Sequence, residues 1–262
     1  MEDTSNKARA RRRPRAQNAP PAGEAMFLGA NKKGSASEVV RRKLREDIIS
    51  LKLVPGTLIN ENRLTEQFGV SRTPVREAIQ RLAEEKLVEV VPKSGTYVGR
   101  IPLSSLPEAI IARSALEAAM VRRAAQVATG SQITTLKALL EQQQEAQIAS
   151  DRNAFHYADD LFHTHITRIA GYPGIWELIL QVRVQIDRYR RLTLPQEGRM
   201  QRVVEEHAAI IAGIEQGNAD LAAQNMTNHL MQLRIDLETF HDLRPEYFIH
   251  DLDLKNLDPT PN

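Results

Sequence analysis

The sequence predicts a mainly α protein in two parts: an N-terminal winged helix-turn-helix with a small β wing, and a C-terminal all-α helical bundle. Two short helical patterns joined by a tight turn and followed by a β-rich hairpin indicate the first part. Helical periodicity that continues over most of the remaining chain indicates the second. A length of 262 residues suits two ordinary domains, and 42% hydrophobic residues suffice for packed cores.

The charge of the chain is divided unevenly between these two parts. Residues 1–100 hold 20 Lys and Arg against 12 Asp and Glu, a net +8, whereas residues 101–262 hold 15 against 21, a net −6. A basic region favours a polyanionic partner because neutralised phosphates release counterions. We therefore expect nucleic acid to bind the first part and not the second.

The composition also excludes several classes of protein. No apolar run approaches the roughly 20 residues of a membrane-spanning helix, so a membrane partner is not expected. The absence of cysteine excludes disulfides, a thiol nucleophile and thiolate ligands, and any metal must be held by histidine and carboxylate. The basic N-terminus lacks the apolar stretch of a secretory signal, which predicts a cytoplasmic protein.

Breaks in periodicity divide the chain into four segments. We expect a disordered basic arm at 1–33, the winged helix-turn-helix domain at 34–101, an all-α domain at 107–243 and a mobile tail at 244–262. The basic run of the arm either lies along DNA phosphates or is only solvated. Glycine and proline divide the all-α domain into roughly six helices, and Ile101-Pro102 is expected to be the linker.

The helix-turn-helix is predicted from helix start and stop signals. A helix of about 15 residues begins at Ser37, and a second runs from about Leu58 to Gly69, which suits a left-handed C-terminal cap. Two residues later a third helix starts, with Pro74 in its first turn, where the missing N–H is tolerated. The hairpin at 87–98 then follows this helix in the manner of a wing.

The N-terminal end of the third helix carries side chains that suit base reading. Either Ser71 or Thr73 caps it, and its apolar face turns Arg72 and Arg76 the other way. Arginine can hold guanine O6 and N7 bidentately, and small hydroxyl residues bind phosphate. The candidate DNA contacts of this helix are therefore Ser71, Arg72, Thr73 and Arg76.

Histidines in the acidic part have the spacing of metal ligands. Asp159 and His163 are four residues apart, so on a helix they project from one face. His207 and His229 flank a break at Gly217 by 10 and 12 residues, so on an antiparallel helical hairpin their imidazoles meet at one level. Three imidazoles and one carboxylate would suit Zn²⁺, Ni²⁺ or Mn²⁺. Ordinary helix-surface histidines are the competing interpretation.

Other residues compete for places in this site. His156 and Asp160 lie seven and three residues before His163, and either of them can replace Asp159 as a ligand. His165 faces away from His163 and is excluded. The two remaining histidines, His241 and His250, fall at or beyond the last helix and are expected to be surface groups.

Several motifs of the first part occur together: LVPG at 53–56, GVSRTPVREA at 69–78 and GTYV at 95–98. Over residues 37–100 the chain resembles the winged-helix domain of the GntR family of bacterial transcription factors. The resemblance implies that Arg72 and Arg76 contact bases or adjoining phosphates, and that Gly95 lets the wing tip enter the minor groove.

Two departures from the GntR pattern lie on the expected DNA face. Where several relatives carry an arginine just inside the second helix, this chain has Asn62 with Arg63 beside it, and either of them is the expected contact. The wing has Lys93 where relatives often have an arginine, so its phosphate contact is less geometrically defined.

The second part carries motifs of its own, namely Arg113 with Leu116-Glu117, Asp159-x-x-Phe162-His163, and Glu206-His207 followed by His229-Leu230. They resemble the FCD ligand-binding domain of the FadR-type branch of GntR regulators. The resemblance implies that the metal ligands are Asp159, His163, His207 and His229. It also implies that Arg113 holds the carboxylate of a small organic acid effector, although the residues alone equally fit a helix-surface ion pair with Glu117. Tyr172 departs from the asparagine of relatives.

The expected function is that of a transcriptional regulator and not of an enzyme. The resemblance implies a homodimer that binds double-stranded operator DNA and responds to a small organic acid beside a divalent metal ion. Because relatives are mostly repressors, we expect a repressor. Two alternatives remain at this stage, a metal-dependent hydrolase and a DNA-binding protein whose bundle serves only dimerisation.

Overall fold

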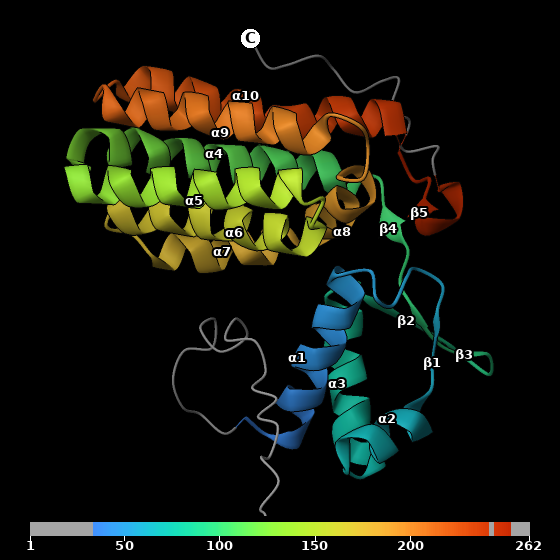
Figure 1. Ribbon diagram of the computed structural model, residues 1–262. Helices are drawn as coiled ribbons and strands as arrows, with labels where there is room; N and C mark the ends of the chain where they lie inside the picture. Colours follow the sequence, from blue (N-terminus) through green and yellow to red (C-terminus); the bar gives the residue numbers. More distant parts are fainter. Residues whose placement is uncertain (1–33, 241–243, 253–262) are drawn as a thin grey trace, which may run out of the picture. The chain divides into compact units, whose positions relative to one another are not determined.

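Helix α1 (Ala36–Ile49) opens the part of the chain that the computed structural model describes, residues 34–240 and 244–252 (Figure 1). Every fourth residue from Val40 to Ile48 is buried, which is the apolar stripe that the sequence predicts. The predicted disordered arm at 1–33 lies outside the described residues. From Ser35 onward the described chain forms one compact unit.

The helix-turn-helix comprises α2 (Glu61–Phe68) and α3 (Arg72–Glu84). Between them Gly69 has the expected left-handed conformation, with φ 62°. The expectation that the second helix begins near Leu58 is wrong. Strand β1 (Leu58–Ile59) pairs with the wing instead, and the side chain of Asn60 then caps α2 by accepting a hydrogen bond from a backbone N–H.

Strands β2 (Val88–Val91) and β3 (Gly95–Val98) form the predicted wing. The sheet is antiparallel throughout, in the order β1-β3-β2. The turn of the wing needs two left-handed residues, Lys93 with φ 64° and Gly95 with φ 144°. Buried apolar residues of α1, α3 and the sheet make one core, which fixes α3 against the wing.

Seven helices follow in the described residues: α4 (Ser105–Val127), α5 (Gly130–Ile148), α6 (Arg152–Ile169), α7 (Gly174–Val182), α8 (Val184–Thr193), α9 (Arg199–Glu215) and α10 (Ala219–Phe240). The sequence predicts roughly six. The additional breaks lack a glycine or proline: left-handed Ser150, with φ 54°, ends α5, Asp151 caps α6, and Arg183 separates α7 from α8.

The bundle encloses an apolar core made by α4, α5, α6, α9 and α10 (Figure 1). Helices α9 and α10 form the predicted antiparallel hairpin and approach each other closely at Gly213. A Cβ atom on Gly213 would lie 2.8 Å from the backbone nitrogen of Ala222, so only glycine fits there. This close contact sets the level at which side chains of the two helices meet.

The expected linker and tail are partly ordered. Strand β4 (Ile101–Pro102) pairs in parallel with β5 (Phe248–Ile249), which follows a 3-10 helix at Pro245–Tyr247. The prediction of a mobile tail from residue 244 is therefore wrong for the described residues 244–252, because Phe248 is buried in an apolar cluster and anchors them. None of the helices in the described part is long and apolar enough to cross a membrane.

Candidate functional site

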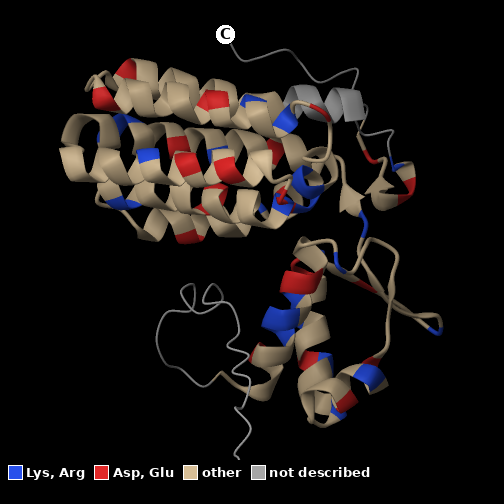
Figure 2. Cartoon of the chain, in the orientation of Figure 1, with Lys and Arg blue, Asp and Glu red and all other residues tan. Residues whose placement is uncertain are grey.

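The N-terminal end of α3 presents the predicted DNA-reading side chains to solvent. Ser71 is the cap residue, but its hydroxyl makes no capping hydrogen bond, and Arg72, Thr73 and Arg76 are exposed. Figure 2 shows Lys and Arg on α1, around α2 and α3, and at the turn of the wing. The exposed positions give these cations free access to a polyanion.

Two polar contacts hold the arginines of α3 against α2. Arg72 donates to the side-chain oxygen of Asn62 at 3.2 Å, and Arg76 donates to a carboxylate oxygen of Glu61 at 3.1 Å. Two-thirds of the Arg76 side chain remains exposed (67%), so this ion pair is weak and exchangeable. Asn62 therefore belongs to the same surface as the recognition arginines.

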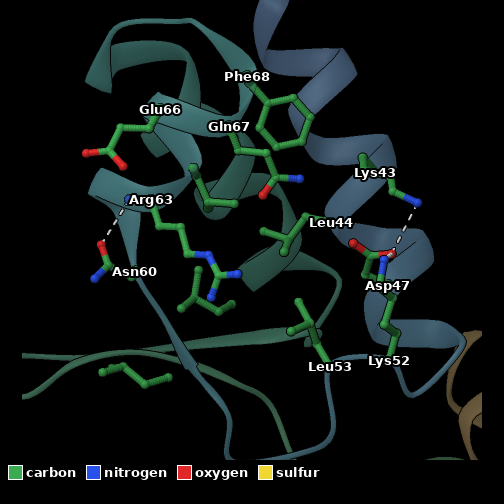
Figure 3. A pocket seen from close by; sticks show the side chains of 13 residues that line it. Lys43, Leu44, Asp47, Lys52, Leu53, Asn60, Arg63, Glu66, Gln67 and Phe68 are labelled. Carbon is green, nitrogen blue, oxygen red and sulfur yellow. Dashed lines mark hydrogen bonds and ion pairs between the residues drawn. The ribbon is translucent and has the colours of Figure 1, made fainter.

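Arg63 lies elsewhere, on a groove of about 690 Å³ between α1, β1 and α2 (Figure 3). The groove has apolar walls, including Leu44, Leu53 and Phe68, and a mixed charged rim. Of the two neighbours predicted as alternatives, only Asn62 contacts a recognition arginine in the described residues.

At the turn of the wing, Lys93 is exposed and Gly95 is left-handed. A Cβ atom on Gly95 would also lie only 3.0 Å from Leu58 of β1. The backbone conformation therefore requires glycine at this position, whereas the exposed end of the Leu58 side chain could move aside. The hydroxyl groups of Ser94 and Tyr97 lie 3.0 Å apart and brace the turn.

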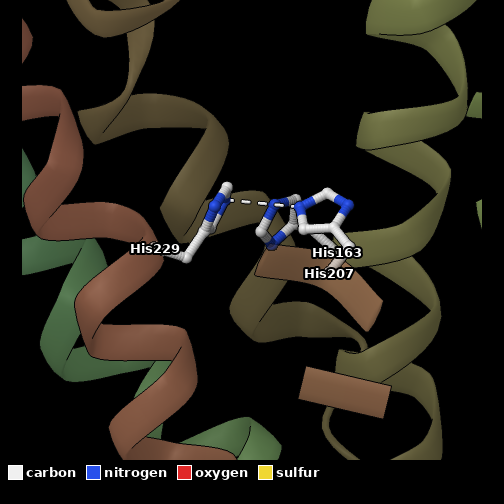
Figure 4. A group of neighbouring side chains, drawn as sticks. All are labelled: His163, His207 and His229. Atoms are coloured by element: carbon white, nitrogen blue, oxygen red, sulfur yellow. Dashed lines mark hydrogen bonds between the residues drawn. The ribbon is translucent and has the colours of Figure 1, made fainter. Parts of the chain in front are cut away.

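Inside the bundle, the structure brings together three of the predicted metal ligands, His163, His207 and His229 (Figure 4), and the fourth, Asp159, lies beside them. The Nε2 atoms of His207 and His229 are 3.3 Å apart, so the level predicted from the helical hairpin is correct. Carboxylate oxygens of Asp159 lie 4.0 Å from His163 Nε2 and 3.8 Å from His207 Nε2. All four side chains are buried.

Each imidazole is oriented by a partner on its other nitrogen. Nδ1 of His207 lies 2.7 Å from the side-chain oxygen of Gln143, and Nδ1 of His229 lies 2.6 Å from a Glu206 carboxylate oxygen. Nδ1 of His163 pairs with Glu117. An acceptor beside Nδ1 favours the tautomer with the proton on that nitrogen, in which the Nε2 lone pair of each ring can bind a cation.

Burial controls the charge of the site. It lowers the pKa of His207 and His229 well below the ordinary histidine value, so both rings are neutral at neutral pH. Burial alone would raise the pKa of Asp159, but the Arg190 guanidinium beside it holds this pKa well below its ordinary value. Burial also raises the pKa of Glu206 to about 7. The centre thus combines the neutral imidazoles of His207 and His229 with an ionised carboxylate.

Arg113 lies beside this centre and is completely buried. Its Nε atom donates to Glu117, so the ion pair that the sequence suggests exists, but inside the bundle and not at the surface. Both terminal nitrogens of the guanidinium are buried without a hydrogen-bond partner among the described residues. A buried unsatisfied donor pair is costly, and two acceptor oxygens of a ligand would satisfy it.

The competing ligands have other surroundings. Asp160 pairs with Arg183 instead. His156 is buried, and both its burial and the nearby arginines lower its pKa. His165 stays outside the group that could hold a metal ion. The exposed His250 contacts the carbonyl of Pro245, and His241 lies outside the described residues.

Three residues of the site were not assigned a role from the sequence: Gln143, Glu206 and Arg190. Gln143 comes from α5 and Arg190 from α8, and no spacing along the chain links them to the histidines. The signal of Gln143 and Arg190 is visible only in three dimensions, as polar groups buried in a bundle, whereas Glu206 stands next to His207 in the sequence. With them the site meets the demands of a metal centre, because its donor set is complete and its rings are oriented.

The comparisons with known proteins agree with both domains. The model of the gntR family of bacterial regulatory proteins matches residues 36–98, and the FCD domain model matches residues 108–232. The chain belongs to the GntR family. It is a DNA-binding transcriptional regulator with an FCD domain, as the sequence predicts.

Relatives of this GntR regulator cover most of its length. It is 30% identical over 212 residues to the HTH-type transcriptional repressor RspR of Escherichia coli, across 81% of this chain and 93% of the relative. It is 26% identical to the Bacillus subtilis gluconate operon transcriptional repressor, across 74% and 82%. The solved structure of E. coli McbR/YncC matches with a TM-score of 0.67 and 25% identity, over 80% and 100%. The family consists of transcriptional regulators and both named relatives are repressors, so this chain is a regulator and not an enzyme.

Proposed function

We propose that this GntR regulator is a repressor whose FCD domain binds a divalent metal ion together with a small organic acid. Its affinity for operator DNA then depends on both ligands. The observation that carries the proposal is the buried group of three imidazoles with the Asp159 carboxylate, beside an arginine with two donors that no described residue satisfies.

The metal proposal rests on the donor set of Asp159, His163, His207 and His229. Nitrogen and oxygen donors of this kind suit Zn²⁺, Ni²⁺ or Mn²⁺. A bound ion would supply a fixed positive charge with open positions for a ligand oxygen. Because the rings of His207 and His229 are already neutral, they need not release a proton before they bind it.

The effector proposal rests on Arg113. Its Nε atom is held by Glu117, and its two terminal nitrogens are left to receive a carboxylate in the bidentate geometry that guanidinium favours. A small acid with a second oxygen donor could bind Arg113 at one end and the metal at the other. One relative is named for the gluconate operon, and gluconate is such a hydroxy acid.

The DNA proposal assigns base reading to Arg72 and Arg76, with Ser71 and Thr73 on phosphates. Asn62 joins this surface through Arg72, and the wing contributes Lys93 and Gly95 in the adjacent groove. In a two-fold homodimer, two such surfaces read inverted half-sites. We leave Arg63 out of this contact set because it lies on the groove of the other face of α2.

The homodimer proposal is supported by apolar side chains that the bundle leaves in solvent. Ile111 on α4 is 61% exposed, and Leu178 and Val182 lie one turn apart on α7, with 48% and 37% exposed. Helices α4 and α7 pack against each other, so these residues belong to neighbouring elements. Exposed apolar clusters of this kind are typical of interfaces.

A regulator of this type acts by population shift. The effector has a different affinity for two packings of the helices, and it therefore favours one of them. If the favoured packing holds the two DNA-binding domains at the wrong spacing, the operator is released. The names of two relatives include the word repressor, which supports an effector that releases the protein from the operator over one that promotes its binding there.

The test is fluorescence anisotropy at fixed salt, with the full-length protein and the DNA upstream of its own gene. Titrations are made with chelated protein and with Zn²⁺, Ni²⁺ or Mn²⁺, each with and without citrate, malate or gluconate. We expect tight operator binding that one acid weakens by at least about fivefold, and only in the metal-loaded protein. Arg113→Met should remove the response to the acid while metal binding, measured by calorimetry, persists.

Two results would overturn the proposal. If neither acid nor chelator alters tight operator binding, the bundle is a dimerisation module only. If a metal changes the melting temperature without creating any response to acids, the ion is structural.

A further inference from the structure

Helix α8 touches both functional regions of this protein through two different faces. Arg190 lies on the face turned to α6, whereas Val184, Gln185 and Arg188 lie on the face turned to the DNA-binding domain. At about 3.6 residues per turn, Arg190 lies roughly 160° around the helix from Arg188, so the two arginines leave α8 on opposite sides.

The second face of α8 holds the DNA-binding domain at two backbone carbonyls. Arg188 donates to the carbonyl oxygen of Gly99, at the end of the wing, and Gln185 donates to that of Lys86, just after α3, at 3.5 Å. Arg188 also donates to the Gln185 side-chain oxygen at 2.9 Å, which locks the two contacts together. Val184 completes the contact by joining the apolar core of the winged helix.

The two carbonyls lie at one place because the chain approaches itself closely there. The Gly99 N–H donates to the carbonyl of Leu87 at 2.9 Å, and a Cβ atom on Gly99 would lie 2.9 Å from the carbonyl oxygen of Lys86. The end of the recognition helix and the end of the wing are thus joined at a single point. A shift of α8 would move both together.

Burying the charged Arg188 side chain at this point is energetically unfavourable. Its side chain is completely buried, and no carboxylate among the described residues pairs with it. Burial lowers the pKa of Arg188 to about 10, and its Nε atom has no hydrogen-bond partner in the described part of the chain. An apolar side chain would pack there at lower cost, so stability alone does not explain the arginine.

The first face of α8 reaches the candidate metal centre. A terminal nitrogen of Arg190 lies 2.7 Å from a carboxylate oxygen of Asp159. Just before the helix, Arg183 pairs with Asp160 and with Asp187. A cation that binds Asp159 competes with Arg190 for the same carboxylate, so occupancy of the centre acts directly on α8.

We infer that α8 connects the pocket to the DNA-reading domain, with Arg190 sensing the charge on Asp159 and Arg188 positioning the joined ends of α3 and the wing. This inference extends the proposed function and rests on it for the natural ligand. The connection itself runs through protein groups only, from Asp159 through Arg190 and α8 to Gly99, and it can be tested without a ligand.

The experiment is a double-mutant cycle on operator affinity in chelated, full-length protein, with the DNA upstream of its own gene. Asp159→Asn releases Arg190, and Arg188→Met removes the carbonyl contact while retaining an apolar side chain of similar length. We expect Asp159→Asn to change the dissociation constant by about fivefold in the wild-type background and by less than about twofold in the Arg188→Met background. In the background of Arg191→Met, on the same helix, Asp159→Asn should still change the dissociation constant by about fivefold, because Arg191 contacts Asn153 of α6 instead.

Hydrogen exchange gives a readout that does not need DNA. Asp159→Asn should change the exchange of the Leu87 and Gly99 amides, and Arg188→Met should abolish that change. If Arg188→Met does not fold, Gln185→Leu replaces it in both measurements, because it removes the contact to Lys86.

An Asp159→Asn effect that is absent, or that is equal in all backgrounds, would overturn the role of α8. The proposed function fails differently. If operator affinity does not respond to metals or acids but the double-mutant cycle is non-additive, the role of α8 stands and the proposed effector is wrong. If operator affinity responds to them but the cycle is additive, the proposed effector stands and the role of α8 is wrong.

Discussion

The DNA-reading surface and the metal centre are built in opposite ways. On α3 the functional side chains are exposed, and their protein partners are few and on the surface, such as Glu61 for Arg76. In the bundle every candidate ligand is buried, and each imidazole has its own partner. The first region obtains its complementary charges from DNA, while the second contains them already.

Because of this difference, substitutions in the two regions should affect ligand affinity and folding stability differently. A surface residue can be removed with little effect on folding, so its loss should appear in binding alone. A buried polar residue that loses its partner leaves another group unsatisfied, so its loss should appear in both. Variants of matched chemistry in the two regions therefore test whether the contrast is real.

The largest effect is expected for Asp159→Asn. The substitution keeps the shape of the side chain but removes the ionised ligand, and we expect metal affinity to fall by more than about 100-fold. It also leaves Arg190 buried without its carboxylate, so the free energy of unfolding of the chelated protein should fall by about 3 kcal/mol. Calorimetry and urea unfolding measure the two effects.

Asp160→Asn is the matched control. Asp160 is the next residue, but its carboxylate is 37% exposed and pairs with Arg183. Metal affinity should change by less than about threefold. A loss equal to that of Asp159→Asn would show that the ligand set is wrongly assigned and that Asp160 is the true ligand.

The next effect is expected for Arg72→Ala and Arg76→Ala on the DNA surface. Each should weaken operator binding by about 10- to 100-fold and relax the base preference at one position of each half-site. Because both side chains are exposed, the melting temperature should stay within about 2 °C of the wild type. Arg81→Ala, near the other end of α3, is the control and should leave base preference unchanged. Equal losses for all three would reduce the surface to a non-specific basic patch.

How much of this could be predicted from the sequence differs between the two regions for the same reason. The recognition helix is defined by neighbours in the chain, so its cap, its exposed arginines and its wing were all predictable. The level of His207 and His229 was predictable too, because a single turn at Gly217 fixes it. What lay beyond prediction depends on how separate helices pack, as with Gln143 on α5 and Arg190 on α8.

The errors have a related cause. Leu58 fits a helical apolar stripe, but it is a strand residue because the wing offers it backbone partners. Phe248 lies in a segment rich in charge and proline, yet an apolar cluster buries it. In both places a contact distant in sequence overrides the local pattern.

A smaller effect is expected for Gln143→Leu. Without the acceptor for Nδ1, the His207 ring can rotate or change tautomer, and metal affinity should fall about tenfold. Gln143→Glu retains an acceptor and should restore most of the affinity. Gln144→Leu, at the exposed neighbouring position, should have no effect. If Gln143→Leu binds metal as the wild type does, the outer hydrogen bond does not orient the ring, and the contrast between the two regions weakens.

The smallest effect is expected for Lys93→Ala at the wing. A lysine that contacts phosphate adds affinity without base preference, so operator binding should weaken by only about threefold, equally for all sequences. The decisive readout is the salt dependence: the slope of log affinity against log salt should decrease by about one unit, because one fewer counterion is released. Lys52→Ala is the control, since Lys52 is 69% exposed but lies on the groove beside α1. An unchanged slope for Lys93→Ala would mean that the wing stays off the phosphates, and base reading by α3 would then have to fix the orientation of the domain without it.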